Sequence, residues 1–181
     1  MELKLLHRDV LYTGKVFDLI VDRVEYPTGN QGVREIAHHP GGAVVVPLFD
    51  DGQVMMVQQL RYPLGKRVLE LPAGKLDKGE VPEHAARREL EEETGWLASA
   101  LQPLTSIYTT PGFCDEELHI FLATGLHESP GGHRREEGEL SMSIHILPLD
   151  QAVTMAVDGR LKDSKTIIGL LLTERYLGKG R

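Results

Sequence analysis

The 181-residue chain has one cysteine, one tryptophan and fewer basic than acidic residues, 20 against 27. A single cysteine, Cys114, excludes an intramolecular disulfide and a cysteine-based zinc site. The net charge of −7 argues against binding nucleic acid by neutralising its phosphates. The longest apolar runs, 43–49 and 167–172, fall well short of the roughly 20 residues that span a bilayer. We therefore expect no nucleic-acid partner, no membrane partner and a cytoplasmic location.

The overall composition of the chain, with 41% hydrophobic and 26% charged residues, is ordinary for a globular domain. Residues 1–40 read as short strands around a turn at 27–30, which predicts a small antiparallel sheet. Further strands are expected at 43–49, 54–62, 68–71, 101–108, 118–123 and 142–147, and helices at 82–94, 149–157 and 165–177, the last capped by Ser164. Mixed strands and helices predict an α/β fold with helices on both faces of a mixed sheet.

The predicted helix 82–94 places three carboxylates on one face. At ~100° per residue, Glu92 and Glu93 fall within about 60° of Glu89 on a helical wheel. Like charges at this spacing destabilise a helix, but crowded carboxylates suit Mg²⁺, which takes oxygen ligands and shares them with substrate phosphates. A glutamate-rich face is more often simply solvated, so the surrounding sequence must decide between the two interpretations.

The residues around this helix follow a specific spacing. The order is Gly74, five residues, Glu80, seven residues, Arg88-Glu89-Leu90, one residue, Glu92-Glu93, one residue and Gly95-Trp96. This pattern resembles the Nudix box at every fixed position. The resemblance implies a Nudix α/β/α sandwich over 41–181, in addition to the N-terminal sheet of 1–40. It also implies hydrolysis of a nucleoside diphosphate linked to another moiety, with Mg²⁺ or Mn²⁺.

The resemblance further implies which residues hold the metal. Glu89 and Glu93 would be ligands, together with the carbonyl of Ala73. Glu92 would be a further ligand or would position a metal-bound water. Arg88 would hold the loop–helix–loop together, as an ion pair with Glu80.

The catalytic base is expected on the long loop 127–139, which contains Glu136, Glu137 and Glu139. Family members carry an acid on a mobile loop before the last strand. Without a gap, that acid would fall on Leu140, so a one-residue offset leaves the choice open. We predict Glu139 first and Glu137 second. Glycines along this loop would let it close over substrate.

Three further segments resemble the ADP-ribose pyrophosphatase subfamily. Pro111 follows the box by 15 residues, and the other two segments are Glu70-Leu71-Pro72-Ala73-Gly74 and Gln58-Gln59-Leu60-Arg61-Tyr62. The subfamily resemblance implies that ADP-ribose is cleaved to AMP and ribose 5-phosphate. It also implies a homodimer in which the N-terminal sheet is swapped between subunits.

The same resemblance suggests four substrate contacts. Arg61 and Arg34 would grip the substrate, Arg34 from the partner subunit, and Glu116 would hold the ribose end. Phe17 would stack on adenine, although a role in the core is an equal alternative. Two other functions remain open: cleavage of another nucleotide sugar such as GDP-mannose, and sensing of ADP-ribose without cleavage.

Overall fold

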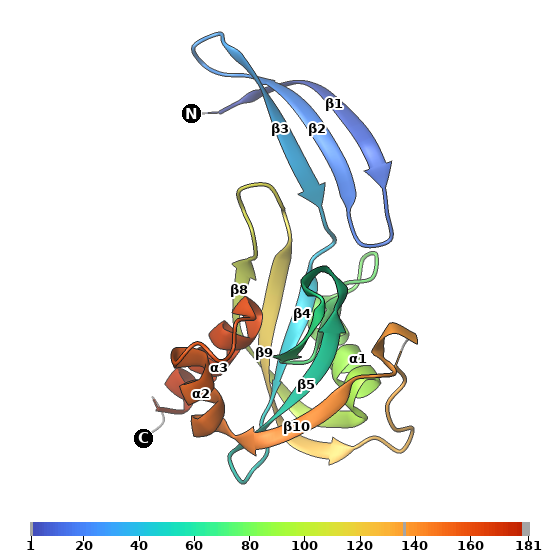
Figure 1. Cartoon of the computed structure of the whole chain (residues 1–181), viewed down its shortest axis with the longest axis vertical. Helices are drawn as coiled ribbons and strands as arrows, with labels where there is room; N and C mark the ends of the chain where they lie inside the picture. Colours follow the sequence, from blue (N-terminus) through green and yellow to red (C-terminus); the bar gives the residue numbers. More distant parts are fainter. Residues whose placement is uncertain (1, 136, 179–181) are drawn as a thin grey trace. The chain divides into compact units, whose positions relative to one another are not determined.

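A computed structural model describes residues 2–135 and 137–178 of the chain, and Figure 1 shows its helices and strands. The chain divides into two compact units. The first runs to Gly41 and also includes Tyr108–Glu117. The second contains Gly42–Ile107 and the chain from Leu118 onward. The first unit therefore takes in the segment around Pro111 as well as the N-terminal strands.

The first unit is built on an antiparallel sheet of three strands in the order β1-β2-β3. These are β1 (Lys4–Thr13), β2 (Asp18–Glu25) and β3 (Gln31–His38). The turn expected at 27–30 is confirmed, because Gly29 has a positive φ of 84° and donates its N–H to the Tyr26 carbonyl. The small N-terminal sheet predicted from the sequence is therefore present.

The second unit contains two sheets. One has the order β7-β4-β9-β8 and the other β10-β5-β6. Their strands are β4 (Gly42–Pro47), β5 (Gln53–Arg61), β6 (Lys66–Glu70), β7 (Ala73–Lys75), β8 (Trp96–Tyr108), β9 (Glu117–Glu128) and β10 (Ser143–Pro148). Parallel pairing of β4 with β9 and antiparallel pairing of β4 with β7 make the first sheet mixed.

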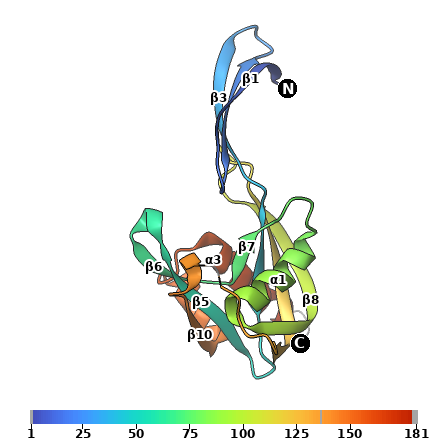
Figure 2. The ribbon, with the colours of Figure 1, turned by 90° about the vertical axis from the view of Figure 1, so that its right-hand side faces the viewer.

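In the part of the chain that the structure describes there are three α-helices, and helices lie on both faces of the sheets (Figure 2). They are α1 (Pro82–Thr94), α2 (Leu149–Val157) and α3 (Ser164–Gly178), and two single 3-10 turns span η1 (Tyr62–Leu64) and η2 (Glu137–Glu139). Alternate residues of the all-buried β4 face opposite ways, Val45 toward α1 and Val44 and Val46 toward α2 and α3. The α/β/α arrangement expected from the sequence is confirmed. Among the described residues, no helix is long and apolar enough to cross a membrane.

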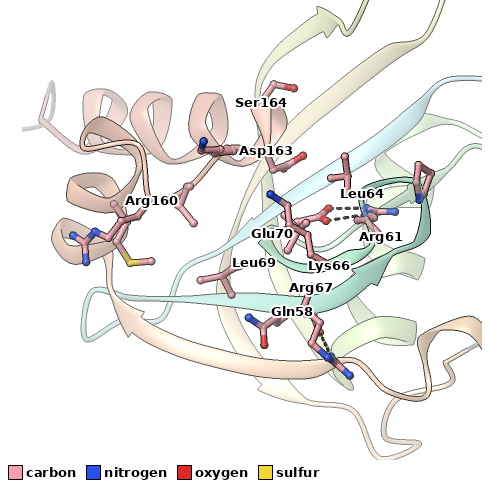
Figure 3. Close-up of a pocket in the computed structure, with 15 residues that line it drawn as sticks. Gln58, Arg61, Leu64, Lys66, Arg67, Leu69, Glu70, Arg160, Asp163 and Ser164 are labelled. Carbon is pink, nitrogen blue, oxygen red and sulfur yellow. Dashed lines mark hydrogen bonds and ion pairs between the residues drawn. The ribbon is translucent and has the colours of Figure 1, made fainter.

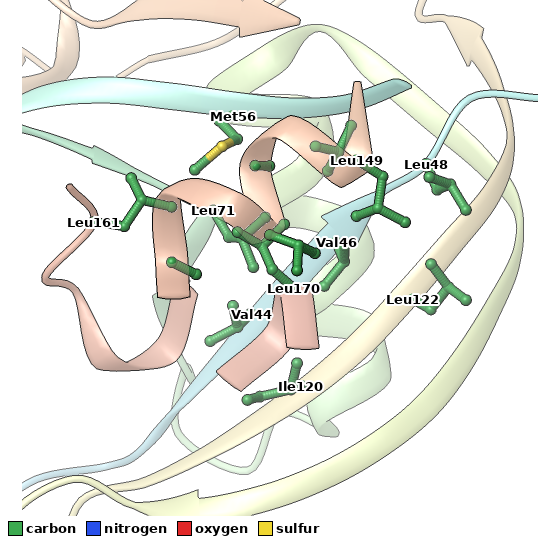
Figure 4. Close-up of a cluster of buried hydrophobic side chains, with 14 of the residues drawn as sticks. Val44, Val46, Leu48, Met56, Leu71, Ile120, Leu122, Leu149, Leu161 and Leu170 are labelled. Atoms are coloured by element: carbon green, nitrogen blue, oxygen red, sulfur yellow. The ribbon is translucent and has the colours of Figure 1, made fainter. Parts of the chain in front are cut away.

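The larger core lies between β4 and the helices α2 and α3 (Figure 4). Leu71, Ile120 and Leu170 are among its fully buried side chains. Leu71 follows directly on β6, so this core extends to the turn that leads into β7. The apolar run 43–49, which the sequence predicts to be a buried strand, therefore packs in the same core as Leu71.

The helix ends follow local rules with one correction. Pro82 occupies the first turn of α1 and Gly95 closes the helix with a φ of 76°, as predicted. The prediction that Ser164 caps the last helix is wrong. Asp163 accepts the N–H of Thr166 at 3.0 Å and its carbonyl accepts that of Ile167, so Asp163 is the cap. Both residue types cap helices well, so the sequence alone does not choose between them.

Candidate active site

The face of α1 that carries the carboxylates lies against β7 rather than in solvent. The exposed fraction is 8% for Glu89 and 2% for Glu93, and Glu92 is half-buried. The Ala73 N–H donates to Glu93 Oε2 at 3.1 Å, which joins α1 to the start of β7. The helical periodicity predicts that the three glutamates share one face, and in the structure two of them, Glu89 and Glu93, are also buried. A buried carboxylate needs a compensating charge or hydrogen bonds.

Gly74 is shaped to receive one of these carboxylates. A Cβ atom at Gly74 would lie 2.0 Å from both Cδ and Oε1 of Glu89, so the absence of a side chain leaves the space that Glu89 fills. Among residues 2–135 and 137–178, no three acidic, histidine or cysteine side chains are already gathered around one point. The atoms here that could bind a cation are all oxygens, from three carboxylates and a nearby backbone carbonyl. A hard divalent cation prefers such oxygen ligands.

Arg88 links the carboxylates of the box. Its Nε and Nη2 bind both oxygens of Glu80, at 3.0 and 2.8 Å, which confirms the expected ion pair. Its Nη1 donates to Glu89 at 2.6 Å and to Glu92 at 3.1 Å, and Nη2 also reaches the carbonyl of Lys75. These acidic partners raise the pKa of Arg88 above its usual value, Glu80 contributing most. The guanidinium therefore screens the repulsion among the glutamates and ties α1 to β7.

The pair between Glu80 and Arg88 makes stability depend on pH. The hydrogen bond from Arg88 lowers the pKa of Glu80 from 4.5 to about 2. A carboxyl with a lowered pKa in the folded state stabilises the protein fully above pH 4.5 and loses that contribution as pH falls toward 2. We expect Glu80→Gln to lower the Tm at pH 7, and the difference from the unchanged protein to shrink between pH 4.5 and 2. Thermal unfolding at several pH values measures it, and a difference that stays constant would contradict the assignment.

The loop after β9 begins at the C-terminal end of α1. Ser129 N donates to the Gly95 carbonyl at 2.8 Å, and Arg134 N donates to that of Glu92 at 2.9 Å. The side chain of Arg135 donates to two carbonyls, those of Glu93 and Met142, each at 2.7 Å. The segment between Arg135 and Met142 is therefore held at both ends beside the backbone of Glu93.

This segment holds the acids expected to include the base. Glu137 is exposed and begins η2. Glu136 lies outside the described residues, and of Glu139 only the backbone, at the end of η2, is described. The choice between Glu139 and Glu137 therefore stays a prediction. The place of the segment next to α1 supports a base on this segment.

Arg61 lies at the end of β5 and is bound to the buried Glu70 of β6. Nε and Nη2 of Arg61 reach the two carboxylate oxygens of Glu70 at 2.8 and 2.6 Å (Figure 3). Burial alone would raise the pKa of Glu70, but the Arg61 hydrogen bonds and the charge of Lys165 outweigh it and lower that pKa. Both residues line a cavity of about 800 Å³ together with Asp163 and Ser164. The guanidinium expected to grip substrate is thus oriented by a carboxylate at the wall of a cavity.

The other expected substrate contacts belong to the first unit. Phe17 is 42% exposed and its ring lies 6.4 Å from that of Tyr12, so the described unit does not bury it in a core. Arg34 donates to the Tyr26 hydroxyl at 2.5 Å and lies over the Tyr26 ring. Glu116 accepts a hydrogen bond from Thr109 at 2.7 Å. The structure therefore brings together Ala73, Arg88 and the α1 glutamates in one unit, and holds Phe17, Arg34 and Glu116 in the other.

Two residues near the site received no role from the sequence. Glu70 interrupts the apolar stretch Val68 to Leu71, and a buried charge between apolar neighbours is a signal that could have marked it. Arg135 sits in a charged loop and carries no such signal. Its position became apparent only from its two backbone contacts.

Comparison with known proteins gives relatives over nearly the whole chain. An ADP-ribose pyrophosphatase of Bacillus subtilis is 42% identical over 92% of this chain and 89% of its own length. A methanol dehydrogenase activator of Bacillus methanolicus is 41% identical over 93% and 91%. An ADP-ribose pyrophosphatase of Mycobacterium tuberculosis is 40% identical over 90% and 79%.

A solved structure and a family model agree with these relatives. The crystal structure of an ADP compounds hydrolase superposes with a TM-score of 0.86, covering 100% of this chain and 97% of that one at 20% identity, which shows a shared fold. The model of the NUDIX domain matches residues 38–168. That range contains the box, α1 and the loop held against it. The chain therefore belongs to the Nudix family of hydrolases.

Proposed function

We propose that the protein hydrolyses the diphosphate bond of ADP-ribose, with Mg²⁺, to AMP and ribose 5-phosphate. The observation that carries the chemistry is the α1 face, where Glu89 fills the space left by Gly74 and Glu93 binds the backbone of Ala73. The substrate is supported by the 42% identity to an ADP-ribose pyrophosphatase and by Pro111 downstream of the box. Mn²⁺ would substitute for Mg²⁺, since both take oxygen ligands.

The residues divide the work between holding the cation and moving a proton. Glu89, Glu93 and the Ala73 carbonyl would hold it, with Glu92 as a further ligand or as the group that positions water. The bound cation would neutralise the diphosphate and lower the pKa of a water molecule. Glu139, or failing that Glu137, would accept the proton of the water that attacks phosphorus. Arg88 would keep the glutamates in place through Glu80.

The proposed substrate contacts are those that the sequence predicts. Arg61 would bind a phosphate through the part of its guanidinium that Glu70 leaves open. Phe17, exposed on the first unit, would stack on adenine, and Arg34 and Glu116 would bind the rest of the nucleotide. These assignments make residues 1–40 part of substrate recognition and residues 41–181 the catalytic domain.

We further propose a homodimer formed through the N-terminal sheet, with Arg34 supplied by the partner subunit. In the first unit only two large apolar residues of the described chain, Ile20 and Val24, are buried. Many more are exposed, namely Leu3, Leu5, Leu6, Val10, Leu11, Tyr12, Val16, Phe17, Val33, Tyr108 and Phe113. Apolar exposure on this scale is typical of an interface. Light scattering on the whole chain measures the expected doubling of mass.

A substrate panel tests the activity. The purified protein is offered ADP-ribose, GDP-mannose and other nucleoside diphosphate derivatives, with Mg²⁺ or with a chelator, and the products are separated by chromatography. We expect AMP and ribose 5-phosphate from ADP-ribose, and no turnover with the chelator. Faster cleavage of GDP-mannose than of ADP-ribose would contradict the proposed substrate and favour a nucleotide sugar instead. Tight ADP-ribose binding without cleavage would instead indicate a sensor.

A further inference from the structure

The N-terminus of α3 reaches the short turn between β6 and β7. Thr166 is fully buried there, and its Oγ1 accepts the N–H of Leu71 at 2.8 Å. The same hydroxyl donates to Asp163 Oδ2 at 2.6 Å, the carboxylate that also caps the helix. Donating and accepting at once fixes the hydroxyl orientation of Thr166. The helix end therefore offers Leu71 one well-placed acceptor.

A lysine binds the same two elements together. Lys165, which is buried, pairs with Asp163 at 2.9 Å and with Glu70, the last residue of β6. Glu70 in turn holds Arg61. Figure 3 shows Asp163 and Ser164 at the start of α3 on the side of the cavity that faces Glu70. Two consecutive residues of α3 thus fix two consecutive residues of the chain leading into β7.

The short turn between β6 and β7 has few backbone groups that can form hydrogen bonds. Only Leu71 and Pro72 separate β6 from β7, and Pro72 has no N–H. The Leu71 N–H goes to Thr166, and the next donor along the chain, Ala73 N–H, goes to Glu93. The Pro72 carbonyl accepts from Val45 of β4 at 2.9 Å. Thr166 and Glu93 therefore hold the same short turn, one from α3 and one from α1.

We propose that Thr166 is a positioning residue that acts through Leu71 to orient Ala73 and Glu93 toward a divalent cation. The proposal rests on the proposed function, because it takes Ala73 and Glu93 as the cation's ligands. It extends the site to α3, which contributes no ligand. Outer groups that orient ligands in this way change metal affinity by roughly 10–100-fold when removed.

The test compares Thr166→Val with Thr166→Ser. Valine has nearly the shape of threonine without the hydroxyl, and serine retains the hydroxyl. The probe is Mn²⁺ alone, whose binding is followed by electron paramagnetic resonance without substrate. We expect Thr166→Val to weaken Mn²⁺ binding about tenfold and to lower kcat more than it raises KM. Thr166→Ser should bind Mn²⁺ within about threefold of the unchanged protein.

A structural control separates positioning from loss of stability. Leu170→Ala, on the same helix and fully buried, opens a cavity in the core without touching the turn's hydrogen bonds. We expect it to lower the Tm while Mn²⁺ binding is unchanged. Equal weakening in Leu170→Ala and Thr166→Val, or no weakening in Thr166→Val, overturns the proposal.

A measurement on the unchanged protein covers the case in which Thr166→Val does not fold. If the turn couples the two helices, Mn²⁺ slows amide hydrogen exchange at Leu71 as well as at Ala73. Exchange that slows at Ala73 alone overturns the proposal. An unchanged protein that binds no Mn²⁺ overturns the metal assignment and the proposal together. If Mn²⁺ binding and the exchange at Leu71 and Ala73 are as expected but ADP-ribose is not cleaved, only the proposed substrate is overturned.

Discussion

Glu93→Gln is expected to lower kcat on ADP-ribose by a factor on the order of 10²–10³, comparable to removing one strong electrostatic group from an active site. Glu93 is 2% exposed, so its charge acts in a site with little solvent screening. The amide oxygen of glutamine can still accept the Ala73 N–H that Glu93 accepts at 3.1 Å. The fold should therefore survive while the negative charge is lost.

Two measurements distinguish this result from unfolding. The Tm of Glu93→Gln should stay close to that of the unchanged protein, and Mn²⁺ binding should weaken along with kcat. Glu83→Gln is the matched control, because Glu83 lies on the same helix but is exposed and pairs with Arg87 at 3.0 Å. Exposed pairs contribute about 0–1 kcal/mol, so neither activity nor Tm should change much. A Glu93→Gln protein with more than a tenth of the normal kcat would contradict the assignment.

Gly74→Ala is expected to have the second largest effect, on the order of 10²-fold in kcat. The added Cβ would lie 2.0 Å from the Glu89 carboxyl carbon, a distance that forces Glu89 out of its place. The φ of Gly74 is not positive, so alanine fits its backbone, and the three atoms nearest to the added Cβ all belong to the Glu89 carboxylate. The substitution thus moves a predicted ligand without changing its chemistry.

Gly178→Ala is the control for the loss of a glycine. A Cβ at Gly178 meets no described atom within 4 Å, and its φ is also not positive. We expect normal activity from Gly178→Ala and weakened Mn²⁺ binding from Gly74→Ala, both assayed beside the unchanged protein. Unaltered Mn²⁺ binding and kcat in Gly74→Ala would show that the place of Glu89 beside Gly74 is irrelevant to the reaction.

Local rules explain why much of the fold could be predicted. Helix α1 has the predicted bounds because Pro82 favours the first turn and Gly95 adopts the left-handed conformation that ends it. The ion pair of Arg88 with Glu80 was expected because the resemblance to the Nudix box assigned it. The cap of α3 was misassigned to Ser164, since adjacent Asp163 has an equally suitable side chain. Sequence alone does not rank two good caps one residue apart.

The sequence by itself determined the family and the carboxylate face of α1, whereas the place of Glu89 beside Gly74 came from the structure. These features lie within one short stretch, 74–96, where helical periodicity and spacing carry the information. Tertiary structure alone decided that Thr166 and Lys165 meet Leu71 and Glu70, 95 residues earlier in the chain. It also decided that Arg135 joins the loop to the backbone of Glu93. Contacts between such distant residues depend on how the sheets and helices pack, and no local pattern encodes that packing.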